Sequence, residues 1–323
     1  MTVGFYLLQR LLYTVPLLLG AVTIVFVLVH LAPGNPVDYI IGESGADKEM
    51  IARLTADMGL DRPLYIQLLR YLGQVATGNL GYSFVSSTPV LELILDRLPA
   101  TLLLMASQLV FSISLGITLG VLSARRPNSL LDNTITVFSL ASFAIPVFWL
   151  GQLLILGFGY YLDWLPIQGM VNLRAGYTGF DHVLDVARHM ILPVATLTLY
   201  NLALILRLTR GSLLEVVGQE YIKVARSKGL SENTVMVKHA LRNALLPVVT
   251  VIGLEFRALI AGAVLTETVF AWPGLGRLTF DAINARDYPL LMGMFIFISL
   301  LVAIGNLVTD LLYALLDPRI RYQ

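Results

Sequence analysis

The sequence predicts an all-α integral membrane protein with six transmembrane helices and a helical insertion between the first two of them. Of its 323 residues, 57% are hydrophobic and only 13% are charged, whereas soluble domains carry about 25% charged residues. The apolar residues gather in stretches close to the roughly 20 residues that a helix needs to cross a bilayer core. Lipid is therefore a better solvent for this chain than water.

Six stretches carry this pattern, and the third and fourth each contain a proline well inside the stretch. Pro146 falls within the third stretch and Pro193 within the fourth. The first stretch is too long for the apolar core of a signal peptide, and no small-residue cleavage site follows it, so we expect it to be a span. The predicted spans lie at about residues 7–31, 100–123, 134–162, 190–206, 247–269 and 290–312.

The basic residues of the short loops predict the orientation. Lys and Arg crowd the loops that follow the second and fourth spans, and Arg319 and Arg321 lie near the end of the sequence. Because Lys and Arg are enriched on the cytoplasmic side, we expect both termini and these two loops in the cytoplasm. The short loops of the opposite side carry only Arg174, Arg188, Arg277 and Arg286.

This orientation divides the chain into predicted parts. They are a first transmembrane helix at 1–32, an extracytoplasmic helical loop at 33–99, a five-helix transmembrane core at 100–316 with a cytoplasmic loop at about 209–246, and a cytoplasmic tail at 317–323.

The extracytoplasmic loop contains two amphipathic segments. Residues 47–58 place apolar side chains at helical spacing, and Gly59 can end that helix in the left-handed conformation. A second helix is expected from Pro63 to about residue 75, since proline suits a first helical turn. The two helices form either a platform for a solute-delivering protein or a solvated cap over the helix ends.

Small residues recur every four positions in two spans. One stripe is Ser112, Gly116 and Gly120, and the other is Ala258, Gly262 and Thr266. Such stripes let helix backbones approach closely in lipid. We expect them to serve packing within one subunit rather than a contact between subunits.

The cytoplasmic loop predicts a helix–turn–helix hairpin. Apolar residues favour one helix from about Ser212 to Lys228, which Gly229 would end. Ser231 can cap a second helix, and Pro247 would then open the fifth span. A short helix joined rigidly to two spans can pass the movement of a partner to them. The alternative is a basic loop held near anionic lipid.

The segment YIKVARSKGLSENTVMVKHALRNALLPVVT resembles the signature loop of binding-protein-dependent ABC importer permeases, and above all their dipeptide, oligopeptide, glutathione and nickel branch. The general pattern of these importers reads Glu-Ala-Ala, three residues, then Gly. Gly229 matches it, but Lys223 stands where the acidic residue would be and Glu220 lies one turn earlier. We therefore do not expect this chain to form the salt bridge that the acidic residue makes in sugar-type importers. Similar motifs along the chain are HLAPGNP, GLDRPLYIQ, GNLGYS, RLTRGSLLEV, TETVFAWPGLGRL, RDYP and LLYALLDPRIRY.

The resemblance implies a type I ABC importer transmembrane domain in a bacterial or archaeal cytoplasmic membrane. Its implied partners are a second homologous permease, two cytoplasmic ATPase subunits, an extracytoplasmic solute-binding protein and membrane lipid, with no nucleic acid. The implied solutes are di- or oligopeptides, with nickel, glutathione or oligosaccharides as alternatives. The residues expected in the ATPase groove are Ala225, Arg226, Ser227, Lys228, Gly229 and Leu230.

The chain itself is not expected to be an enzyme. It has no GxxxxGK[ST] phosphate loop, so ATP and magnesium are expected in the partner subunits and no cofactor in this chain. It has no cysteine, and its four histidines form no HExxH cluster, so thiolate and HExxH metal sites are excluded. An intramembrane hydrolase would need a nucleophile with a base in reach, and no span offers a persuasive Ser and His pair.

The predicted fifth span carries internal charges. Glu255 and Arg257 are two residues apart, so they lie on different faces of a helix and should not pair with each other. A charge near the bilayer centre costs about 2.5–3.5 kcal/mol on insertion scales. We expect Glu255 to face the translocation cavity, where it can meet a solute ammonium group; the alternative is an ion pair with the partner permease or with another helix. Arg257 can extend toward the cytoplasm, and Glu267, near the outer end, is either a structural cap or a gate.

One competing function is a secondary transporter or channel that uses no ATP. Such proteins carry acidic relays in several spans or paired broken helices in two inverted halves. Only the fifth span carries strong internal charge, and the sequence shows no convincing repeat, so we favour the importer.

Overall fold

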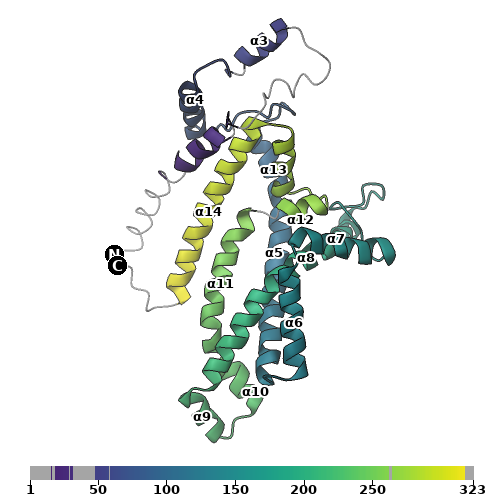
Figure 1. Ribbon diagram of the computed structural model, residues 1–323, viewed down its shortest axis with the longest axis vertical. Helices are drawn as coiled ribbons and strands as arrows, with labels where there is room; N and C mark the ends of the chain where they lie inside the picture. Colours follow the sequence, from purple (N-terminus) through teal and green to yellow (C-terminus); the bar gives the residue numbers. More distant parts are fainter. Residues whose placement is uncertain are drawn as a thin grey trace. The chain divides into compact units, whose positions relative to one another are not determined.

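The computed structural model describes residues 16, 19–28, 30–31, 48–57, 59–261 and 264–316. The regular structure of these residues is helical, apart from one isolated bridge between Tyr82 and Pro89 (Figure 1). The chain divides into two compact units, one of Met1–Thr101 with Gly274–Gln323 and one of Leu102–Pro273. The predicted all-α fold class is therefore confirmed.

The first unit combines the inserted region with the last two helices. Gly59, at φ +68°, follows α3, and Pro63 directly precedes α4, as the sequence predicts. The start of α5 packs closely on α14, because a Cβ on Gly293 would lie 2.4 Å from Cγ1 of Val90. The helices are α3 (Lys48–Asp57), α4 (Leu64–Ala76), the first turns of α5 (Val90–Arg125), α13 (Leu275–Asn284) and α14 (Tyr288–Leu316).

The second unit is built around α8, which contacts α6, α7, α11 and α12. Its elements are the rest of α5, α6 (Leu130–Ala144), α7 (Val147–Leu154), the π-helix η2 (Ile155–Tyr161), α8 (Gly179–Val217), α9 (Glu220–Ser227), α10 (Glu232–Thr234), the π-helix η3 (Val235–Ala240), α11 (Leu241–Ala261) and α12 (Val264–Val269).

The glycine stripe of α5 is used inside this unit. A Cβ on Gly116 would lie 2.6 Å from Cγ2 of Ile205, and one on Gly120 would lie 2.7 Å from Cβ of Thr209. Only glycine allows α5 and α8 to approach this closely. The expectation of packing within one subunit is confirmed here, while Gly262 of the second stripe lies outside the described residues.

Within the described residues, three helices are long and apolar enough to cross a membrane, namely Val90–Arg125, Gly179–Val217 and Tyr288–Asn306. The first two contain the predicted second and fourth spans, and the third covers residues 290–306 of the predicted sixth span. The first predicted span is represented by the apolar helix Leu19–Leu28, and residues 7–15 lie outside the described part. The count of six spans stays a prediction.

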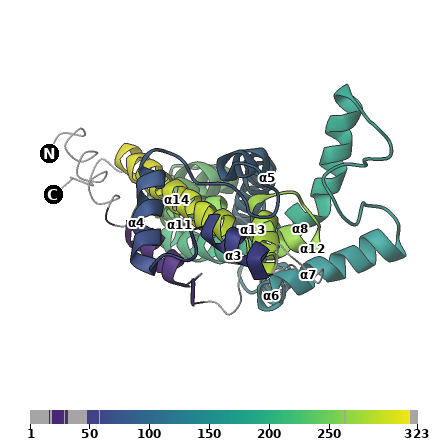
Figure 2. The same cartoon turned by 90° about the horizontal axis from the view of Figure 1, so that it is seen from above.

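The predicted third span is not a straight helix. The chain bends by 107° between the helical segments Leu130–Ala144 and Val147–Tyr161. The two segments are a fourth candidate for a membrane span only if they are taken together as one broken span. Figure 2 shows α7 running sideways from the end of α6. The break lies at Pro146, which disfavours a helical conformation in the residue before it, and Ile145 is extended at ψ 130°.

Two helices extend beyond the predicted spans. Helix α5 begins at Val90, ahead of the span predicted from about Ala100, and runs through Pro99. Helix α11 begins at Leu241 and runs through Pro247, which therefore does not begin the helix.

Candidate functional site

The loop between the fourth and fifth predicted spans forms a compact helical hairpin. In Figure 1, α9 and α10 lie at the lower ends of α8 and α11. The chain leaves α8 at Val217, forms α9, turns at Gly229 and returns through α10 and η3 into α11. The predicted hairpin is present, but its helices differ from the predicted ones.

The prediction of a single helix from Ser212 to Lys228 is wrong. Helix α8 ends at Val217, Gln219 is extended at ψ 152°, and α9 starts at Glu220. The cause lies in the burial pattern: Leu213 and Ile222, which share one core, are nine residues apart and would face opposite sides of a straight helix at 3.6 residues per turn. The break after Val217 turns both side chains toward that core.

The predicted turn chemistry is confirmed. Gly229 has φ +75°, a left-handed conformation that suits glycine, and its N–H donates to the carbonyl oxygen of Arg226 at 2.9 Å. Ser231 is the N-cap of the following helix, and its Oγ accepts a bond from the N–H of Thr234 at 3.4 Å.

One hydrophobic cluster anchors the hairpin to three longer helices. It joins Ala124 of α5 and Leu213 of α8 to α9, η3 and α11. Because close-packed interiors transmit displacement, a force on α9 would reach α8 and α11. Its buried members are Ala124, Leu213, Val216, Ile222, Ala225, Val235, Met236, Ala240 and Ala244.

The cluster separates the predicted contact residues into two groups. Ala225 is 7% exposed and belongs to the core, so its side chain does not face outward. The other five residues of this set are exposed; they are Arg226, Ser227, Lys228, Gly229 and Leu230.

The outer face of α9 also carries apolar side chains that the sequence had not placed at a contact surface. Tyr221 is 39% exposed and Val224 is 52% exposed. Tyr221 and Val224 are three residues apart and so neighbours on a helix surface, about 100° around it from Ile222 and Ala225, and this spacing is the signal that could have identified them.

The charges of the hairpin are partly paired. Arg226 makes two hydrogen bonds to Glu232, from Nε at 3.1 Å and from a terminal nitrogen at 2.7 Å. The Arg226 guanidinium lowers the pKa of the Glu232 carboxyl. Lys223 pairs with Glu220 at 2.7 Å, whereas Lys228 has no ion-pair partner in the part of the chain that the structure describes.

A buried ion pair lies next to this hairpin. Asp132 of α6 is 1% exposed, and Arg210 of α8 donates to both of its carboxylate oxygens at 2.7 Å. The hydroxyl of Ser123 and the N–H of Asn128 also donate to this carboxylate. The group therefore joins the α5–α6 turn to α8, and sequence reading had not identified it.

The predicted substrate-path residues belong to two helices of the second unit. Glu255 and Arg257 lie in α11, but their side chains are outside the described residues. Glu267 lies in α12 with an exposure of 0%, so its side chain is inside the second unit rather than on a surface. No group of three or more His, Cys, Asp or Glu among the described residues could hold a metal ion.

Known families cover almost the whole chain. Residues 116–322 match the family described as binding-protein-dependent transport system inner membrane component. Residues 4–105 match the N-terminal family of the same membrane component.

Curated relatives match along their full length. The dipeptide transport system permease protein DppB of Escherichia coli K12 is 41% identical over 335 residues, covering 98% of this chain and 99% of that protein. The oligopeptide transport system permease protein AppB of Bacillus subtilis is 43% identical over 320 residues, with the same coverage. The di/tripeptide transport system permease protein DppB of Pseudomonas aeruginosa is 41% identical over 332 residues.

A solved structure of similar fold is the inward-facing methionine ABC transporter MetNI. Its matching chain has a TM-score of 0.55 and 17% identity, covering 70% of this chain and 97% of that chain. At this identity the likeness concerns the fold, and it confirms the importer transmembrane domain that the sequence predicts. By its family match and its full-length relatives, the chain belongs to the inner membrane components of binding-protein-dependent transport systems.

Proposed function

We propose that this chain is the permease subunit of an ATP-driven importer of di- and oligopeptides, and that α9 is the helix through which ATPase subunits move it. The observation that carries the proposal is the two-sided character of α9. Its inner side, with Ile222 and Ala225, is fixed in the core shared with α8 and α11, while Tyr221 and Val224 stay exposed. An exposed apolar stripe on a rigid support is typical of an interaction surface.

The expected contact surface is revised by the geometry. Arg226, Ser227, Lys228, Gly229 and Leu230 remain candidates for contact with an ATPase groove. Ala225 serves as an anchor that holds α9 on the cluster, because its side chain is buried. The outer contacts are completed by Tyr221 and Val224.

The chain carries out no chemistry in this proposal. ATP and magnesium are bound by two cytoplasmic partner subunits, which supply the free energy by hydrolysis. A second homologous permease completes the translocation path, and a solute-binding protein delivers the solute from outside. Family membership supports this assembly, since the family is defined by dependence on a binding protein.

The proposed location is a bacterial or archaeal cytoplasmic membrane, with both termini and the α9 hairpin in the cytoplasm. The basic residues of the hairpin support this orientation. The inserted region that contains α3 and α4 then lies outside, next to the binding protein.

The names of the relatives support peptides as the solute, since they are dipeptide, oligopeptide and di/tripeptide permeases. Nickel, glutathione and oligosaccharides remain the alternatives implied by the resemblance. In this proposal Glu255 faces the path and meets the solute ammonium group, Arg257 lies nearer the cytoplasm, and Glu267 holds the outer end of the path by its burial in α12.

The test is to place a charge on the exposed stripe of α9. Val224→Asp would put a carboxylate into an apolar contact, and we expect co-purification of the ATPase subunits and ATP-dependent dipeptide uptake to fall about tenfold or more. The matched control is Leu173→Asp, because Leu173 is 89% exposed and precedes α8. The proposal fails if Val224→Asp keeps its ATPase subunits, or if both variants lose them equally.

A further inference from the structure

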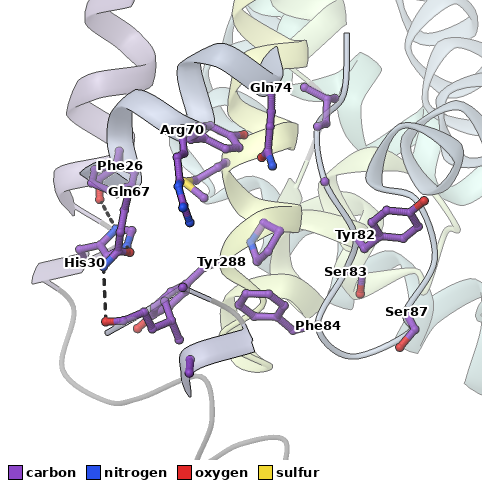
Figure 3. Close-up of a pocket in the computed structure, with 18 residues that line it drawn as sticks. Phe26, His30, Gln67, Arg70, Gln74, Tyr82, Ser83, Phe84, Ser87 and Tyr288 are labelled. Atoms are coloured by element: carbon purple, nitrogen blue, oxygen red, sulfur yellow. Dashed lines mark hydrogen bonds between the residues drawn. The ribbon is translucent and has the colours of Figure 1, made fainter. Parts of the chain in front are cut away.

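A polar cavity lies in the first unit. Its volume is about 610 Å³, within the roughly 300–1,000 Å³ of small-molecule pockets. It is lined by residues of α4, of the 80–88 turn and of the start of α14, together with Phe26 and His30 (Figure 3). Neither the family resemblance nor α9 accounts for it.

The cavity has a basic character. Arg70 extends from α4 into it in Figure 3, and none of its lining residues is Asp or Glu. Within the described residues, Arg70 has no ion-pair or hydrogen-bond partner. The neighbouring carboxylate of Asp287 is occupied by the hydroxyl of Ser83 and by the N–H of Phe84 at 3.1 Å. The guanidinium of Arg70 is thus available to an incoming anion.

Tyr71 adds a hydrogen-bond donor with no protein partner. The residue is 7% exposed and lines the cavity, and its hydroxyl oxygen is buried without a hydrogen bond. Burial raises the pKa of the Tyr71 hydroxyl, so the group stays protonated and can donate. Buried hydroxyl groups in proteins are normally satisfied, and one that is not indicates a missing partner.

His30 and Gln67 form a fixed wall rather than free ligands. Nδ1 of His30 donates to the carbonyl oxygen of Phe26 at 2.8 Å, and Nε2 faces Oε1 of Gln67 at 3.2 Å. The amide nitrogen of Gln67 donates to the carbonyl oxygen of Arg62 at 2.7 Å, which sets its orientation. Both ring nitrogens of His30 therefore already face oxygen atoms of the protein.

Aromatic rings form part of the remaining walls. The ring of His30 stacks on Phe26 with 4.0 Å between centroids and lies 5.8 Å from that of Tyr288. Phe84 lines the opposite part of the cavity. A cation, a buried hydroxyl donor and apolar rings together suit a small organic acid with an apolar side chain, since a guanidinium binds a carboxylate through two hydrogen bonds.

We propose that this cavity binds a short peptide by its free C-terminal carboxylate, with Arg70 as the counter-ion and the Tyr71 hydroxyl as a second donor. The inference rests on the proposed function for the peptide class, and it adds a solute site to the permease itself. According to this inference, Arg70 and Tyr71 cause the cavity to bind peptides with a free C-terminal carboxylate more tightly than the corresponding C-terminal amides. The cavity then holds solute at the outer face after the binding protein has released it.

The test measures peptide binding by the intact importer, reconstituted with its partner subunits but without the solute-binding protein. The probes are alanyl-phenylalanine and its C-terminal amide, measured by isothermal titration calorimetry. We expect the acid to bind about tenfold or more tightly than the amide, the factor that corresponds to a hydrogen-bonded charge. Arg70→Gln should remove this preference, and Tyr71→Phe should weaken acid binding severalfold.

The matched control is Arg53→Gln, since Arg53 of α3 does not line the cavity. It pairs with Glu49 on the surface, where the two side chains are 75% and 79% exposed. Its preference for the acid should equal that of the wild type. Equal binding of acid and amide by the wild type would overturn the inference, as would an Arg70→Gln variant that keeps the preference. If Arg70→Gln weakens only the affinity for the solute-binding protein, the cavity is a docking contact and the inference is wrong.

Dipeptide uptake by the complete importer separates this inference from the proposed function. A wild-type importer that takes up dipeptides but binds none without the binding protein contradicts the cavity site alone. An importer that takes up no peptide contradicts the proposed function.

Discussion

At the scale of single residues, the buried charge of Asp132 is the feature with the largest expected effect on stability. Its carboxylate accepts two bonds from Arg210 and further bonds from Ser123 and Asn128. Removing one partner of a buried ion pair leaves the other charge uncompensated, which is strongly destabilising. Arg210 retains a side-chain exposure of 27%, which limits the cost.

Asp132→Asn should lower the free energy of unfolding by about 2–4 kcal/mol, because the neutral amide cannot accept both bonds from the guanidinium. Thermal unfolding of the detergent-purified chain, followed by tryptophan fluorescence, measures the change. The control is Asp96→Asn, whose pair with Arg97 is solvent-exposed and should contribute about 1 kcal/mol or less. Equal unfolding temperatures for the two variants would contradict this role of Asp132.

Residue types that act through local backbone geometry were predictable from the sequence. Gly229 and Gly59 take the left-handed conformation, and Ser231 caps its helix, because each of these roles depends on a few neighbouring residues. The Asp132–Arg210 pair was not predictable, since its partners lie 78 residues apart and meet only through the packing of α6 on α8.

At the scale of elements, helix breaks limit what periodicity can predict. Leu213, Val216, Ile222 and Ala225 are apolar in one continuous stretch, which favours one helix in the sequence. They share a core only because the chain turns after Val217. Similarly, the apolar composition of residues 134–162 predicts one span, and composition contains no information on the 107° bend at Pro146.

Gly229→Pro should abolish ATP-coupled transport while leaving membrane insertion intact. Proline fixes φ near −65°, whereas Gly229 has φ +75°, and proline also lacks the N–H that donates to Arg226. The return from α9 to α10 would therefore be displaced. Dipeptide uptake and the amount of chain in the membrane fraction check the two parts of this prediction.

The matched variant is Gly229→Asn, because asparagine tolerates the left-handed conformation better than other residues with a Cβ atom. It should retain most of the uptake, since a Cβ at this position meets no atom within 4 Å. Normal transport by Gly229→Pro would show that the geometry of this turn does not matter for coupling.

At the scale of the whole molecule, composition and span length predicted the fold class, and motifs that resemble those of a known family predicted the family. Both signals are spread over the chain, so errors at single boundaries, such as the start of α5 at Val90, did not affect them. The cavity beside Arg70 was not predictable, because its walls come from residues as far apart as Phe26 and Met292. No sequence period links such residues.

The orientation of the chain gives the last prediction. Leu173, which is 89% exposed, precedes α8, and the exposed Lys228 follows it. If α8 crosses the membrane once, these two positions must face opposite sides. The excess of Lys and Arg around Lys228 places that side in the cytoplasm.

The sequence contains no cysteine, so Leu173→Cys and Lys228→Cys each introduce a single reactive thiol. In intact spheroplasts a membrane-impermeant maleimide should label Leu173→Cys, and it should label Lys228→Cys only after the membrane is permeabilised. Labelling of both from outside would mean that α8 does not separate them. The reverse pattern would put α9 outside the cell, where no ATP-hydrolysing subunit could reach it.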